Sequence, residues 1–199
     1  YTWEQFDSGG TLGATSSLFE LNSDNGNNPL FRSYNPVDVA QRYFPQLIDV
    51  LAGQTSLGET YATTDRDMRF RLTARDNKGG VNQQDLVITV TTANQTFSID
   101  TPTQWQASSL QTVTWDSGDT LNAPINCSNV DISLITDTDN PLETSVLLQT
   151  PNDEQQNVSV PNISSSGARL VLRCSDNIFY ALSAQDFSII SAEPVAPLK

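Results

Sequence analysis

The sequence predicts an all-β protein made of two antiparallel β-sandwiches in tandem. Apolar and polar residues alternate along its apolar segments, and turn residues interrupt the chain every few positions. Alternation with a period of two gives a strand one apolar and one wet face, and many short strands between turns are typical of sandwiches. The hydrophobic content of 37% is enough for such cores, because each sheet keeps one face in water.

The first predicted domain, residues 1–94, begins with a strand over residues 1–7, in which Trp3 is the expected core residue. A second short strand is expected at residues 18–21. Because the chain opens inside a strand, we expect it to be part of a longer precursor.

A short helix is predicted over residues 46–51. Pro45 lies near its start and Gly53 just past its end, as is common for helices. An irregular loop held by Phe44 and Leu47 is the alternative. In the helical interpretation one face is apolar and consists of Leu47, Val50 and Leu51.

The clearest pattern predicts a β-hairpin over residues 68–92. Five turn-forming residues, DNKGG at 76–80, separate its arms. The residues predicted to face solvent on the first arm are Arg69, Arg71, Thr73 and Arg75. The residues predicted to face the core are Phe70, Leu72, Ala74, Leu86, Ile88 and Val90.

Residues 95–192 are predicted to form a second, complete sandwich, followed by a Pro-rich linker or tail at 193–199. Its predicted strands are 97–100, 111–116, 130–136, 145–150, 157–161, 168–174, 178–182 and 186–190. The residues expected to point inward are Val113, Trp115, Ile132, Leu134, Leu170 and Leu172.

The two cysteines, Cys127 and Cys174, both fall in the second domain, one before a central strand and one at the end of a later strand. We interpret them as a disulfide between strands, which implies an oxidising, extracellular compartment. Two buried free thiols are the alternative.

Charge and composition exclude several classes of function. A net charge of −13 repels phosphate backbones and anionic membranes, so neither nucleic-acid binding nor membrane insertion is expected. The absence of histidine excludes Ser-His-Asp and Cys-His catalysis and zinc sites built on imidazole. The remaining enzymatic route is a pair of carboxylates facing each other in a cleft, as in glycosidases.

Two kinds of binding site stay open. Calcium could be bound by acidic turns, although each of these turns is better explained as a solvated or self-capped loop. Carbohydrate could be bound by exposed aromatic residues, although packing in the core is the default for them. The acidic candidates are Asp65, Asp67, Asp76 with Asn77, Asp137 and Asp139; the aromatic candidates are Trp105, Tyr34, Tyr43 and Tyr180.

Several motifs occur in an order that resembles a known family. YTWEQFDSG, FRLTARDNKGG and DLVITV are similar to the later strands of polycystic-kidney-disease-type immunoglobulin-like domains. A larger set occurs along the chain in the order PLFRSYNP, RYFPQLIDVLAG, RFRLTARDNKGG, FSIDTPTQW, QTVTWD, APINCSNVDISL and NIFYALSAQDFSI. The set resembles the non-catalytic region after the catalytic domain of secreted bacterial reprolysin-like zinc metalloproteases.

This resemblance implies two tandem immunoglobulin-like domains in a secreted protein. The first of them is expected to lack its opening strands, which would lie before Tyr1 in the family. Their expected role is to engage a protein or polysaccharide substrate or a surface, or to support the catalytic domain of the same precursor. The family's His-Glu-x-x-His zinc helix has no counterpart in this sequence, so no catalytic or metal-binding residue is expected and this chain is not expected to be an enzyme. A carbohydrate-binding module and a calcium-dependent adhesive module are the alternatives.

Overall fold

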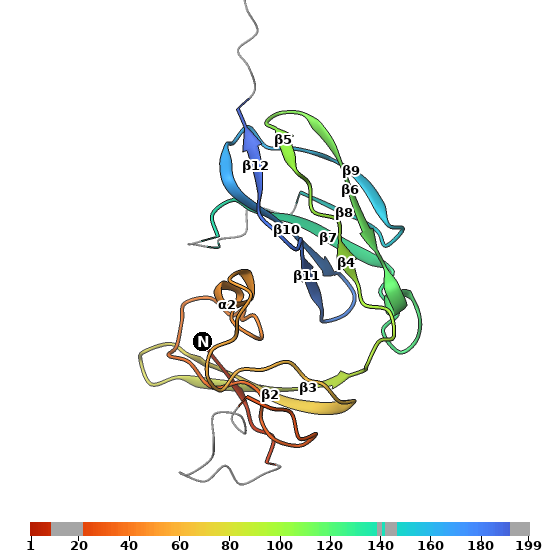
Figure 1. The fold of residues 1–199 in the computed structure, drawn as a ribbon. Helices are drawn as coiled ribbons and strands as arrows, with labels where there is room; N and C mark the ends of the chain where they lie inside the picture. The colour runs from red at the N-terminus through yellow and green to blue at the C-terminus, as the bar shows by residue number, and fades with distance from the viewer. Residues whose placement is uncertain (9–21, 139–140, 142–146, 192–199) are drawn as a thin grey trace, which may run out of the picture. The chain divides into compact units, whose positions relative to one another are not determined.

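The computed structural model describes residues 1–8, 22–138, 141 and 147–191, and it confirms the predicted all-β class (Figure 1). The chain divides into two compact units, residues Tyr1–Thr92 and Ala93–Lys199. Each unit has its own sheets and its own hydrophobic core. The predicted strand at 18–21 and the predicted tail at 193–199 lie outside the described residues.

The first unit contains a three-stranded antiparallel sheet in the order β1-β2-β3. The predicted hairpin is confirmed: β2 and β3 are antiparallel and joined by ten consecutive residue pairs. The strands are β1 (Thr2–Gln5), β2 (Arg66–Arg75) and β3 (Val81–Val90). The described residues of this unit contain one sheet, so an immunoglobulin-like sandwich is not confirmed here.

The core of the first unit lies between β2 and the long connection from β1. Met68 and Phe70 of β2 are buried together with Leu30 and Phe31 of the connection. The rings of Phe44 and Phe70 lie 4.8 Å apart. The described part of this connection, residues 22–65, therefore packs on the apolar face of the sheet.

The alternation predicted for β2 is correct at Phe70 but wrong at Thr73. Thr73 was expected to face solvent, yet it is only 1% exposed, whereas Leu72 and Ala74 are half-buried. Because β2 is the central strand, Thr73 has Thr2 of β1 on one side and a β3 residue on the other. Neighbours on both sides shield a short side chain even on a polar face.

The predicted short helix is confirmed as α2 (Leu47–Leu51). Leu47 and Leu51 are buried and Val50 is half-buried, so they share one side of the helix as expected. The helix begins after Gln46, whose side chain makes no capping hydrogen bond. Its first turn is instead held by the carboxylate of Glu59, which accepts the backbone N–H of Gln46 at 2.9 Å.

The second unit contains two sheets that share one core, which agrees with a β-sandwich. The larger sheet has the order β5-β12-β10-β7-β8, with β11 also paired to β10, and the smaller has the order β4-β6-β9. The smaller sheet is β4 (Ser98–Ile99), β6 (Leu110–Asp116) and β9 (Gln155–Ser159). The larger sheet is β5 (Gln104–Gln106), β7 (Asn129–Ile135), β8 (Leu148–Pro151), β10 (Ser165–Cys174), β11 (Tyr180–Leu182) and β12 (Phe187–Ile190).

All six residues predicted to point inward in this unit are at most 4% exposed. Trp115 of β6 is buried and donates from Nε1 to Oδ1 of the buried Asn152 at 2.8 Å. Asn152 in turn donates from Nδ2 to the carbonyl of Cys127 at 3.0 Å and to Oγ1 of Thr120, in the 3₁₀ turn η1 (Gly118–Leu121), at 3.2 Å. The core therefore includes one satisfied polar network.

Candidate functional site

The predicted disulfide is confirmed: Cys127 and Cys174 are joined by an S–S bond of 2.09 Å. It links the segment that precedes β7 to the last residue of β10, across 47 positions of sequence. Cys127 is completely buried and Cys174 is 8% exposed. The bond therefore fixes two neighbouring strands at one end of the larger sheet.

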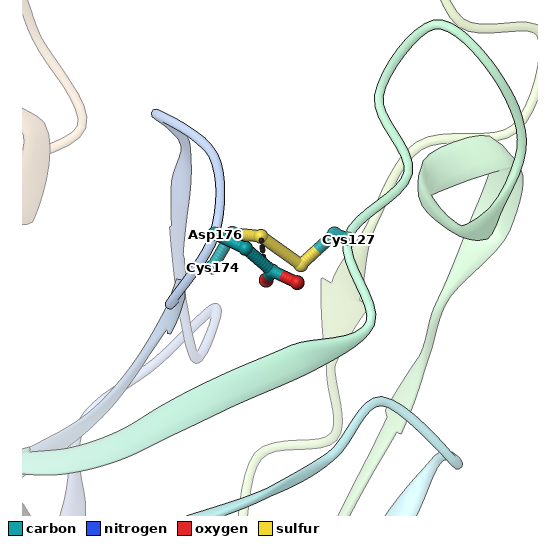
Figure 2. Close-up of side chains that lie close together, drawn as sticks. All are labelled: Cys127, Cys174 and Asp176. Carbon is teal, nitrogen blue, oxygen red and sulfur yellow. Dashed lines mark hydrogen bonds between the residues drawn. A yellow bond between two sulfur atoms is a disulfide. The ribbon is translucent and has the colours of Figure 1, made fainter.

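Asp176 lies directly beside this disulfide, as Figure 2 shows. Its carboxylate is 3.3 Å from Sγ of Cys174 and accepts the backbone N–H groups of Ser128 and Asn129 at 3.2 and 3.4 Å. The two sulfurs and the carboxylate all lie within 4.8 Å of one another. Both sulfurs are used in the covalent bond, so they offer no thiolate to a metal ion.

A second polar cluster lies in the first unit around Arg66 and Asp24. Arg66 occupies the same face of β2 as the core residues Met68 and Phe70, and its side chain is 3% exposed. Its Nη1 donates to Oδ1 of Asp24 at 2.7 Å, and its Nη2 donates to the carbonyl of Asn28 at 2.6 Å. Asp24 is thus the counter-charge of a buried guanidinium.

Asp24 also organises the loops around it, because five hydrogen bonds converge on its carboxylate. Burial alone would raise the pKa of Asp24, but these donors outweigh burial and lower the pKa from 3.8 to about 2. The donors are the N–H of Thr63, the N–H of Gly26, the N–H and hydroxyl of Thr64, and Arg66 Nη1.

Replacing Asp24 by asparagine should lower the free energy of unfolding of the first unit by about 2 kcal/mol, because Arg66 then stays buried without its counter-charge. Oδ2 of Asp7, 3.9 Å from Arg66 Nη2, should limit the loss. Urea unfolding at pH 7 measures this. The control Asp85→Asn removes an exposed pair with Arg71 and should change stability little.

The Asp24 carboxylate should also make the stability of the first unit depend on pH. The pKa of Asp24 is lower in the folded than in the unfolded protein. Its contribution to the free energy of unfolding is therefore fully present above about pH 4 and is lost as the pH falls towards 2. Wild-type stability should therefore fall more steeply over this interval than that of Asp24→Asn. Equal slopes for the two proteins would contradict this assignment.

A third cluster, also in the first unit, is the ion pair between Arg42 and Glu59. Glu59 is 0% exposed, and its Oε1 accepts from Arg42 Nη2 at 2.5 Å. The Arg42 guanidinium also lies 4.3 Å from the centre of the Phe44 ring and donates to the carbonyl of Trp3 at 2.9 Å. Through the bond to Trp3, Arg42 attaches the segment that carries this ion pair to β1.

The acidic calcium candidates in the described residues mostly accept hydrogen bonds from their own surroundings. Asp76 Oδ1 accepts the N–H groups of Lys78 and Gly80, both at 2.8 Å, which caps the hairpin turn. Asp65 accepts the N–H and hydroxyl of Thr92, and Asp67 accepts the hydroxyl of Thr89. These donors lower the pKa values of Asp65 and Asp76. Asp139 lies outside the described residues.

None of the four aromatic candidates is fully exposed. Trp105 is 3% exposed and packs against Phe187 of the second unit at 4.9 Å. Tyr34, in the first unit, packs against Arg42, whose guanidinium carbon lies 4.8 Å from the centre of the Tyr34 ring. Tyr43 and Tyr180 are half-buried.

One surface hollow lies beside the Arg66 cluster and was not predicted from the sequence. It has a volume of about 540 Å³ and a polar lining that includes Asp7, Asn25, Asn27, Asp67 and Arg69. The sequence does carry one signal for this region. Arg66 lies two residues before Met68 and four before Phe70, so it shares their face of the strand. An arginine on a core-facing position predicts a buried acidic partner.

Comparisons with known proteins found no counterpart for this chain: no family model, no curated protein and no solved structure matches it. Among the described residues, no helix has the length and apolar character needed to cross a bilayer.

Proposed function

We propose that this chain is a non-catalytic accessory region of a secreted bacterial zinc metalloprotease. Its role is to engage the protein substrate or a surface and to support the catalytic domain of the same precursor. The proposal rests on the ordered motifs of the sequence, which resemble such regions. The disulfide of the second unit is compatible with an extracellular location.

The structural observation that supports this role is the use of the charged groups. Asp24, Glu59, Asp65 and Asp76 each accept hydrogen bonds that hold loops or turns in place. Carboxylates used in this way keep the loops and turns in fixed positions, which suits a rigid module for binding or spacing.

Two assays on the full chain test the proposal. With added zinc, the purified chain should not cleave casein or gelatin, whereas a zinc protease added to the same sample should. Immobilised chain should retain soluble gelatin or casein more strongly than the same resin carrying reduced, unfolded chain. Turnover that copurifies with the chain would contradict the proposal.

Two further measurements address the alternative functions. Retention on insoluble cellulose or chitin, without retention of protein, would favour a carbohydrate-binding module. Calcium at 100 times its dissociation constant would add about 2.7 kcal/mol of stability, so a clear rise in melting temperature in millimolar calcium would favour an adhesive module. We expect neither result.

A further inference from the structure

The carboxylate of Asp176 is held against the disulfide by the protein backbone. Its two oxygens accept the N–H groups of Ser128 and Asn129, the residues that follow Cys127. One oxygen lies 3.3 Å from Sγ of Cys174 (Figure 2). A disulfide sulfur has no proton to donate, so this contact places a negative charge beside the bond rather than a hydrogen bond across it.

Reduction of this bond by a thiol involves negative charge on two sulfur atoms, that of the attacking thiolate and that of the leaving cysteine. The attacking thiolate must approach Sγ of Cys174, since Cys127 is fully buried and Cys174 is 8% exposed. As the new S–S bond forms, the bond to Cys127 breaks and its electron pair stays on Cys127 Sγ, which then takes a proton from water. A second thiolate releases Cys174 from the mixed disulfide.

Asp176 opposes both of these charges. It repels an anionic thiol before attack, and it disfavours the thiolate that develops on Cys127, which also has the carbonyl oxygen of Asn129 at 3.3 Å. A leaving thiol with a raised pKa leaves more slowly. Two further charges at this end of β7 and β10, Asp131 and Arg173, are opposite in sign and occupy paired positions of the two strands.

We propose that the negative charge of Asp176 makes the rate at which the Cys127–Cys174 bond is reduced depend on the charge of the reducing thiol. Anionic thiols, such as those that carry a carboxylate or sulfonate group, reduce the bond slowly. Cationic thiols of similar size reduce it faster. The bond thus persists in the presence of anionic thiols without being completely enclosed.

The test compares the rates at which cysteamine and 2-mercaptoethanesulfonate reduce the full, folded chain, at equal thiolate concentrations and low salt. Two unit charges 4 Å apart interact by about 1 kcal/mol in water, which is about fivefold in rate. The cationic-to-anionic rate ratio should therefore fall at least about fivefold in Asp176→Asn. Asp176→Glu, which keeps the charge, should retain most of the wild-type ratio.

The matched control is Asp186→Asn, which removes the same charge from the second unit. Asp186 pairs with Arg169, which lies five residues from Cys174 along β10 and so about 16 Å away. At that distance a unit charge acts about four times more weakly than at 4 Å, even without screening by salt. Its rate ratio should stay at the wild-type value. If Asp176→Asn merely loosens the loop, both thiols will react faster and the ratio will not change; that result would overturn the proposal.

Discussion

Replacing Glu59 by alanine is expected to lower the free energy of unfolding of the first unit by about 3–5 kcal/mol, as is usual when one partner of a buried ion pair is removed. The change leaves the guanidinium of Arg42, 12% exposed, without its carboxylate. It also removes the acceptor for the N–H of Gln46, where α2 begins. Urea unfolding followed by far-ultraviolet circular dichroism measures the loss.

A double variant separates charge from packing at this position. Arg42→Met combined with Glu59→Leu removes both charges and keeps side chains of similar volume, so it should recover most of the stability lost in Glu59→Ala. If the double variant is as unstable as the single one, the loss came from packing and backbone contacts, and the electrostatic explanation is wrong. The contacts of Arg42 with the Trp3 carbonyl make an incomplete recovery reasonable.

Removing the disulfide by replacing Cys127 and Cys174 with alanine should destabilise the second unit by about 4 kcal/mol. The value follows from the loop entropy that a bond between residues 47 positions apart removes from the unfolded chain. The first unit contains neither cysteine, so its stability should not change. Hydrogen exchange with mass spectrometry measures both units in one sample.

The reduced wild-type chain provides the control for this prediction. It retains both sulfur atoms and lacks only the covalent bond, so it should show a similar loss confined to the second unit. If the alanine variant loses much more stability than the reduced protein, the difference reports the packing of the buried Cys127 side chain rather than the cross-link. Equal protection of the second unit before and after reduction would contradict the prediction.

Much of the fold could be predicted because local alternation decides which side chains are buried. Val113 and Trp115 alternate with polar residues on β6, and both are buried. The short strand β5 could not be predicted in this way. It has three residues, contains one apolar side chain, and pairs in parallel with β12, far away in the sequence. No local pattern reports such a partner.

The polar clusters were mostly beyond prediction because their partners are distant in sequence. Arg66 and Asp24 are 42 positions apart, and Asp24 looks like any other acidic residue of a turn. The disulfide was predictable for a simple reason: with two cysteines in the chain, there is one way to pair them. Asp176 had no such signal, since its importance comes from where the backbone after Cys174 places it.

The pairing of β1 with β2 has a consequence for how the first unit folds. The hairpin β2–β3 forms between neighbouring segments, whereas β1 must find its partner across a long connection; the Asp7 carboxylate accepts from the Arg69 N–H, 62 positions away. Closing such a loop costs more conformational entropy and is slower than closing a hairpin. We therefore expect the hairpin to nucleate this unit and β1 to dock late, which makes β1 the segment most readily exchanged with a competing strand.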